Sequence, residues 1–322
     1  MVKGRAFEIK AKDEIFENEI KNQCCARAFL FAALKTSGTV EVNSKGFFVK
    51  ISTPLEKLAL YCARLITMLE GVRPEINTAK YTAGTKKGET LYVVCPSKSA
   101  SRALITECGL MREQNGMFTQ FIIGISKDVV AKECCVKSYA AGLLASAGSV
   151  YVPQDGAEGY HLEFSFTDEN TVLDFIKLME ISGISFKKGE RGAIHIAYSK
   201  DKGTMTSFLA FLNLPEATLE LKKIIEEREI KNNINRNVIC EAANLDKVYA
   251  ASARQLVAIS QIDKTVGLQS LKKPLYDVAM ARLGNPRASM SELSEMLGVT
   301  KSCLEHRFRR LEQIAEEKGA IK

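Results

Sequence analysis

The stretch CCARAFLFAALKTSGTVEV, residues 24 to 42, returns as CCVKSYAAGLLASAGSVYV, residues 134 to 152. At the constant offset of 110 residues, both Cys, one Leu, the Gly and two Val are identical. Arg also pairs with Lys, Phe with Tyr and Thr with Ser, so the match preserves charge, ring and hydroxyl group as well as apolarity. Each copy has the pattern of an apolar helix that ends at Gly and leads into a strand.

The segments that follow the two copies also correspond. A strand, a helix, a second strand and a second helix are indicated after the first copy at 46–53, 54–70, 90–96 and 99–110. The same order is indicated after the second copy at 160–167, 168–182, 193–199 and 203–214. Alternating apolar residues mark the strands and a spacing near 3.6 marks the helices. Residues 1–215 therefore predict one domain of two tandem α+β repeats, about 24–112 and 134–215, each with helices on one face of a sheet.

Small residues in the doubled helix predict that its two copies pack against each other. The residues that would allow a close approach are Ala32, Ala33, Gly142, Ala145 and Ala147. We expect Gly38 and Gly148 to adopt the left-handed backbone conformation, because each ends a helix and is followed directly by a strand. A buried amphipathic helix without a special partner would explain either copy, but not both.

The composition is that of a folded protein without membrane spans. The chain has 322 residues, of which 46% are hydrophobic and 26% charged. The longest wholly apolar run, at 28–34, is far shorter than the roughly 18 residues of a membrane span. The N-terminus is charged and lacks the apolar core of a signal peptide. We expect a cytoplasmic protein with no membrane partner.

Nine cysteines include two adjacent pairs, Cys24 with Cys25 and Cys134 with Cys135. The chain shows neither a CxxC motif nor a Cys/His cluster at the spacing of a zinc site. Most of the cysteines fall in apolar segments, where a free Cys packs as a small hydrophobic residue. We expect buried packing, with redox sensing by the adjacent pairs as the alternative, and we predict no metal and no cofactor.

The net charge of +7 is concentrated near the C-terminus. Residues 221–322 contain 18 Lys and Arg against 13 Asp and Glu, which weakly indicates a polyanionic partner. Residues 216–235 alternate in charge and predict an exposed helical linker that ends in a polar turn at Asn232 and Asn233. Residues 236–322 show only helix patterns and predict an all-α domain.

Residues 289–317, SMSELSEMLGVTKSCLEHRFRRLEQIAEE, have the pattern of a helix-turn-helix. Ser289 and Glu292 form a capping box, Gly298 ends the first helix and Thr300 caps the second. The predicted inner face of the second helix consists of Leu304, Phe308, Leu311 and Ala315.

The outer face of that second helix is polar and rich in hydrogen-bond donors. Its residues are Lys301, Ser302, His306, Arg309, Arg310 and Gln313. Such side chains donate to base edges or phosphates, so we predict that they bind DNA. His306 either reads a base or lies at the surface, since no second metal ligand stands near it. An ordinary helical hairpin with a solvated face remains the alternative.

Two segments, NINRNVICEAANLDK at 233–247 and KSCLEHRFRRLEQIA at 301–315, strongly resemble the WhiA family of bacterial transcription regulators. The resemblance covers nearly the whole chain. Its signature residues are Asn235, Arg236, Cys240, Glu241, Ala243, Asn244, Leu245 and Lys247. It implies a degenerate LAGLIDADG homing endonuclease-like domain, followed by a helix-turn-helix similar to region 4 of sigma factors.

The resemblance also implies a role and partners. The expected role lies in cell division or chromosome segregation, with sporulation in spore formers. The expected partner is double-stranded DNA, with RNA polymerase or another transcription regulator as a further candidate, and the location is then the nucleoid.

A LAGLIDADG nuclease needs an acid just before the terminal Gly of each motif helix, because two carboxylates hold its divalent metal ions. Those positions are Ser37 and Ala147 here, and neither can ionise to bind a metal. The next acids, Glu41 and Asp155, fall in or past the following strands. We therefore predict a DNA-binding regulator and no enzyme. An architectural nucleoid protein or a residual homing-type endonuclease are the alternatives.

Overall fold

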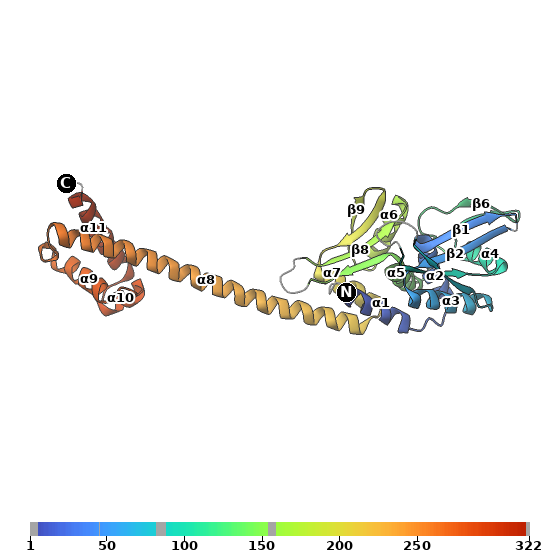
Figure 1. Cartoon of the computed structure of the whole chain (residues 1–322), viewed down its shortest axis with the longest axis horizontal. Helices are drawn as coiled ribbons and strands as arrows, with labels where there is room; N and C mark the ends of the chain where they lie inside the picture. The colour runs from blue at the N-terminus through green and yellow to red at the C-terminus, as the bar shows by residue number, and fades with distance from the viewer. Residues whose placement is uncertain (1–5, 45, 82–87, 154–158, 320–322) are drawn as a thin grey trace. The chain divides into compact units, whose positions relative to one another are not determined.

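The computed structural model describes residues 6–44, 46–81, 88–153 and 159–319, and Figure 1 shows the course of the chain. The chain divides into two compact units, Met1–Glu226 and Glu227–Lys322. The first unit contains both copies of the doubled stretch with their sheets, and the second is helical.

The first repeat forms a four-stranded antiparallel sheet with the order β1-β2-β4-β3. Its elements are α2 (Gln23–Ser37), β1 (Gly38–Asn43), β2 (Gly46–Thr53), α3 (Glu56–Glu70), β3 (Glu75–Lys80), β4 (Thr90–Cys95) and α4 (Lys98–Glu107). The core strands β2 and β4 and the helices between them lie where the sequence patterns predict them.

The second repeat has the equivalent order, β7-β8-β10-β9, again antiparallel. Its elements are α5 (Glu133–Ala147), β7 (Gly148–Tyr151), β8 (His161–Phe166), α6 (Glu169–Ile181), β9 (Lys187–Arg191), β10 (Ile194–Ser199) and α7 (Lys202–Phe211). Because each strand occupies the same place in both sheets, the predicted two-repeat α+β fold is confirmed. The periodicity did not indicate the outer strands β3 and β9, nor the hairpin of β5 (Met111–Gln114) and β6 (Met117–Phe121).

Helices α2 and α5 pack against each other between the two sheets, as Figure 1 shows. They approach so closely that a Cβ atom on Gly142 would stand 2.5 Å from the carbonyl oxygen of Phe29. Ala32 and Ala33 are fully buried in the same contact. Residues without large side chains are required where two helix backbones meet at this distance, so the prediction from the small residues is confirmed.

Gly38 and Gly148 correct one expectation, because both adopt extended backbone rather than the left-handed conformation. Their φ values are −92° and −83°. Glycine is needed here for space: a Cβ atom would lie 2.3 Å from the carbonyl oxygen of Leu34 in the first copy and 2.7 Å from the Cα of Leu144 in the second. The strand thus folds back against the last turn of its helix, which no larger residue would permit.

Helix α1 (Ala6–Glu17) is an element that the charged N-terminal sequence did not indicate. Its Glu14 is buried, and the two carboxylate oxygens accept hydrogen bonds from the backbone amides of Glu216 and Ala217, each at 2.8 Å. These amides belong to the first turn of α8, where an anion is stabilised by the helix dipole and by unpaired N–H groups. A residue distant in sequence therefore caps α8.

Helix α8 is continuous from Pro215 to Thr265, so the predicted turn at Asn232 and Asn233 is wrong. Asn lowers helix stability only modestly, and the sequence from 216 to 265 contains no Gly or Pro that would end the helix. The end comes at Gly267, which adopts a φ of 75° and donates its N–H to the carbonyl oxygen of Ile262.

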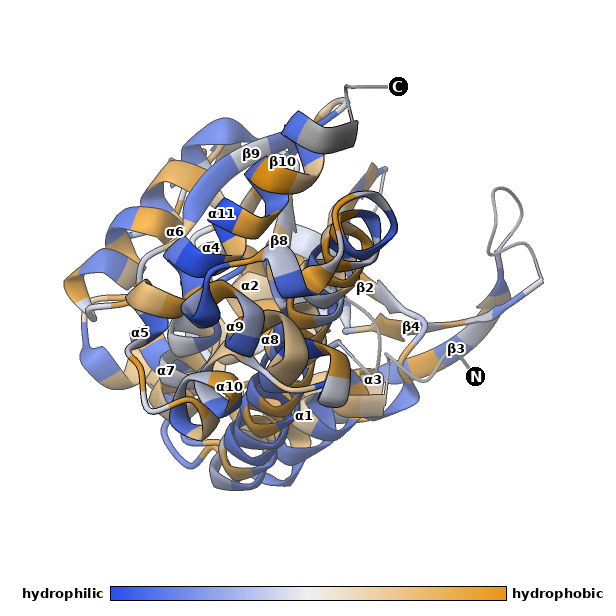
Figure 2. Ribbon diagram, turned by 90° about the vertical axis from the view of Figure 1, so that its left-hand side faces the viewer, coloured by the Kyte–Doolittle hydropathy of each residue, from blue (hydrophilic) through white to orange (hydrophobic). Residues whose placement is uncertain are grey.

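The helical unit consists of the C-terminal part of α8, a short 3₁₀ turn (Leu268–Ser270), α9 (Lys273–Gly284), α10 (Met290–Met296) and α11 (Lys301–Gly319). Hydrophilic and hydrophobic residues alternate along its ribbons, as they do in the first unit (Figure 2). Within the described residues, no helix is long and apolar enough to span a bilayer.

The backbone contact between α2 and α5 predicts a destabilised variant. We expect Gly142→Ala to lower the free energy of unfolding by about 1–3 kcal/mol, because the new methyl group meets the Phe29 carbonyl and the helices must separate. Urea unfolding followed by circular dichroism measures the change.

The matched control is Gly284→Ala, since nothing lies within 4 Å of a Cβ atom at that position. We expect this control to leave the unfolding curve nearly unchanged. Equal curves for Gly142→Ala and the control would show that the helix pair is not packed backbone to backbone.

Candidate nucleic-acid interface

The helical unit has its own hydrophobic core. Ile259 of α8, Val278 of α9 and Leu293 of α10 are fully buried in it. Helix α11 contributes its predicted inner face, and all four of those residues are buried: Leu304, Phe308, Leu311 and Ala315. The predicted amphipathic orientation of α11 is thereby confirmed.

The start of α10 and the turn between α10 and α11 have the predicted capping geometry. Ser289 Oγ accepts from the amide of Glu292 at 3.2 Å, and the Glu292 carboxylate accepts from the amide of Ser289 at 2.7 Å. These hydrogen bonds favour the charged carboxylate and hold the pKa of Glu292 below its usual value. Gly298 has a φ of 63°, and Thr300 caps α11 by accepting from the amide of Cys303 at 3.2 Å.

A buried arginine, Arg282 of α9, fixes the segment that leads into α10. It is only 1% exposed, and its Nε donates to the side-chain oxygen of Gln255 in α8 at 2.9 Å. Its Nη1 donates to the carbonyl oxygen of Ala288 at 2.6 Å, and its guanidinium lies 5.4 Å from the centroid of the Phe308 ring. Burial lowers the pKa of Arg282, since the guanidinium is withdrawn from water among uncharged acceptors.

Sequence reasoning missed this arginine. A basic residue in the last turn of a short helix is ordinarily solvated, and no local pattern distinguishes a buried arginine at such a position from an exposed one. The contact partners of Arg282 come from three separate segments, α8, α11 and the residues before α10. Through these contacts, the orientation of α11 is set from inside the unit.

The six residues predicted to bind DNA are all exposed on α11. They are Lys301, Ser302, His306, Arg309, Arg310 and Gln313. Arg310 donates to the side-chain oxygen of Gln313 at 3.2 Å and lies 3.6 Å from Glu317, in contacts that water screens and that a phosphate can replace. Glu305, also exposed, places one negative charge beside this face.

The signature residues lie along the exposed middle of α8. Asn235, Arg236, Asn244 and Lys247 are all exposed, and Leu245 is 54% exposed. These side chains stand outside the buried cluster of the helical unit. Packing of the described residues therefore does not explain the signature.

The C-terminal ends of the paired helices α2 and α5 hold the two positions at which the sequence predicts that nuclease acids have been lost. Ser37 and Ala147 end α2 and α5, and one residue earlier Thr36 Oγ1 donates to Ser146 Oγ at 2.7 Å across the helix pair. Glu41 lies on β1 and forms an ion pair with Lys50 at 2.7 Å, away from the helix ends. Asp155 lies outside the described residues.

Two lysines, Lys12 and Lys35, donate hydrogen bonds to carbonyl groups near the ends of α5 and α2. Lys12 of α1 is nearly buried, and its Nζ donates to the carbonyl oxygen of Gly148 at 2.8 Å. Glu8 forms an ion pair with Lys12 at 2.8 Å and accepts from the amide of Val150 at 3.3 Å. At the end of α2, Lys35 donates to the carbonyl oxygen of Ile122, and burial lowers its pKa. The end of α5 therefore carries a Lys12–Glu8 ion pair rather than an unpaired carboxylate.

Three family models together match most of the chain. Residues 23–111 match the WhiA N-terminal LAGLIDADG-like domain, residues 136–231 the WhiA LAGLIDADG-like domain, and residues 234–315 the WhiA C-terminal HTH domain. The crystal structure of full-length DUF199/WhiA from Thermatoga maritima shares the fold, with a TM-score of 0.54 and 23% identity over 96% of this chain and 97% of that one.

Two curated relatives are named "Probable cell division protein WhiA". The protein from Clostridium botulinum strain Hall is 31% identical over 97% of this chain and 98% of its own length. The protein from Shouchella clausii is 32% identical over 97% of this chain and 94% of its own length. With its two LAGLIDADG-like repeats followed by a helix-turn-helix unit, the chain belongs to the WhiA family.

Proposed function

We propose that this protein is a sequence-specific DNA-binding regulator of the WhiA type that reads DNA with α11. The observation that carries the proposal is the exposed donor face of α11, which the capped turn and the buried Arg282 hold in a fixed orientation. A recognition helix needs such a fixed face, since base readout depends on the direction of each donor.

The residues of this face take different roles in the proposal. Arg309, Arg310 and Lys301 neutralise phosphates or donate to guanine, while Ser302 and the N-terminal turn of α11 suit a phosphate oxygen. His306 and Gln313 are the proposed base readers. The signature residues Asn235, Arg236, Asn244 and Lys247 form a second polar surface, which we assign to DNA or to a protein partner such as RNA polymerase or another transcription regulator.

The two-repeat unit keeps the shape of the LAGLIDADG scaffold and, in this proposal, binds without cutting. The support is electrostatic: Ser37 and Ala147 offer no carboxylate, and Lys12 already occupies the carbonyl at the end of α5. The names of the relatives indicate cell division as the process, and the more specific roles in this proposal are sporulation in spore formers or chromosome segregation. Binding to DNA would place the protein in the cytoplasm, at the nucleoid.

An architectural nucleoid protein is the alternative within the same class. Both kinds of protein occupy DNA, but only a regulator changes transcription at the genes next to its sites. Genome-wide occupancy combined with transcript changes in a deletion strain separates the two. Occupancy without a change in neighbouring transcripts would favour the architectural role.

If the exposed face of α11 binds DNA, removing its arginines should weaken DNA binding. We expect the double variant Arg309→Ala, Arg310→Ala to bind DNA about tenfold more weakly or worse, and the dependence of log Kd on log salt to become shallower by about one to two, because fewer counterions are released. Fluorescence anisotropy over a salt series measures both effects.

The matched control is Lys222→Ala, Lys223→Ala, which removes the same charge from exposed positions of α8. We expect its affinity to stay within about twofold of the parent chain. If the control loses as much affinity as the α11 variant, net charge rather than the α11 face governs binding.

The absence of carboxylates at Ser37 and Ala147 predicts that the purified chain leaves supercoiled plasmid intact in the presence of Mg²⁺. Agarose gels of plasmid incubated with Mg²⁺ or with chelator measure this. Glu8 is the carboxylate beside the end of α5, so Glu8→Gln is the informative variant. Plasmid cleavage that depends on Mg²⁺ and is absent in the Glu8→Gln variant would contradict the proposed loss of nuclease activity.

A further inference from the structure

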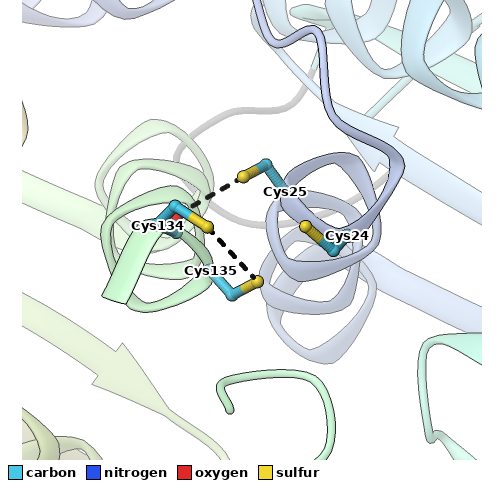
Figure 3. A group of neighbouring side chains, drawn as sticks. All are labelled: Cys24, Cys25, Cys134 and Cys135. Atoms are coloured by element: carbon cyan, nitrogen blue, oxygen red, sulfur yellow. Dashed lines mark hydrogen bonds between the residues drawn. The ribbon is translucent and has the colours of Figure 1, made fainter. Parts of the chain in front are cut away.

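Four cysteines that form two separate pairs in the sequence lie in a single cluster in the structure. Cys24 and Cys25 belong to the first turn of α2, and Cys134 and Cys135 to the first turn of α5. All four Sγ atoms lie within 4.8 Å of one another. Figure 3 shows the side chains gathered between the starts of the two paired helices.

The distances between the sulfurs are close to those of a tetrahedral thiolate site. A metal–sulfur bond of about 2.3 Å places the four sulfurs of such a site about 3.8 Å apart. The Sγ atoms of Cys134 and Cys135 are 4.0 Å apart. The most distant pair must approach by at most about 1 Å, a movement that small side-chain rotations supply.

Two positive features lie beside the cluster, the starts of α2 and α5 and the side chain of Lys132, and they offset part of the cost of charging the buried sulfurs. The residues preceding the two helices, Asn22 and Lys132, make no side-chain cap hydrogen bond, so the positive ends of both helices act on the nearby sulfurs. Lys132 adds a positive charge beside Cys24.

The protonation of the thiols and the exposure of the cluster to solvent also affect metal binding. Burial raises the pKa of Cys25 to about 11 and that of Cys135 to about 12, so a metal ion must displace protons from these two thiols. Cys134 is exposed, which gives an ion a path from solvent to the two buried sulfurs.

We propose that Cys24, Cys25, Cys134 and Cys135 bind one thiophilic divalent metal ion with the coordination chemistry of Zn²⁺. Four cysteine sulfurs around one centre match the ligand set of a structural zinc site. The all-sulfur tetrahedral environment selects Zn²⁺ over harder cations. A disulfide would use only two of the four and would need an oxidant. The metal ion joins the starts of α2 and α5, whereas the hydrogen bond between Thr36 and Ser146 joins their other ends.

The sequence did not indicate this site, because its cysteines are adjacent pairs rather than a CxxC motif. The ligands come from two segments 110 residues apart, and only the pairing of α2 with α5 brings them together. The site therefore depends on the assembled two-repeat unit and is independent of DNA binding by α11.

Metal titration of the full-length chain tests the proposal. The protein is purified without oxygen, treated with chelator and titrated with Co²⁺ and then Zn²⁺. We expect about one Co²⁺ per chain, with the ligand-field bands of tetrahedral Co²⁺ and a sulfur-to-cobalt charge-transfer band, and displacement by Zn²⁺. Zn²⁺ should raise the midpoint of thermal unfolding by roughly 5 °C or more.

Two pairs of variants make the test specific. Cys24→Ser with Cys135→Ser removes one ligand from each helix and should abolish the cobalt spectrum and the thermal shift. Cys240→Ser with Cys303→Ser alters cysteines of the helical unit and should leave both unchanged. A spectrum lost equally in both double variants would overturn the proposal. So would a chain that binds neither ion while its four clustered thiols oxidise to disulfides in air.

Discussion

The contact between the backbones of α2 and α5 is the constraint on which the two-repeat unit depends. Gly142 stands over the carbonyl of Phe29, with no room for a side chain between the helices. Because the helices meet there, the apolar faces of both repeats join in one buried cluster that extends from Phe7 to Leu221. Neither sheet has to provide a complete core by itself, which explains why each repeat is small.

The same pairing determines what each end of the helix pair can do. At one end it places four sulfurs together, and at the other it places Thr36 against Ser146. A nuclease would require two carboxylates at this second end, held together in spite of their repulsion by a divalent cation. Here the hydrogen bond between Thr36 and Ser146 and the bond from Lys12 to the carbonyl of Gly148 pair polar groups at these helix ends.

Local patterns predicted much of the fold and little of what depends on distant contacts. The doubled stretch, the central strands and the capped α10–α11 turn follow from periodicity and neighbouring residues, and the structure confirms them. Helix α1 and the outer strands lack a clear pattern, and the continuity of α8 is decided by the absence of Gly and Pro rather than by its polar Asn pair. The exposure of the α11 face was predictable, whereas the buried contacts of Arg282 were not, since their partners are far apart in sequence.

In the proposed DNA-binding role, Arg282 contributes inside the helical unit rather than at its surface. The whole chain carries only +7, which is too little to make charge alone a strong determinant of DNA binding. Specific readout requires hydrogen-bond donors with fixed directions, because a donor that points away from a base edge cannot form a hydrogen bond with it. The guanidinium binds α8 through Gln255, contacts the ring of Phe308 in α11 and holds the carbonyl of Ala288 before α10. The buried guanidinium thus links α8, α11 and the segment before α10, the parts of the unit from which the proposed DNA-binding face is built.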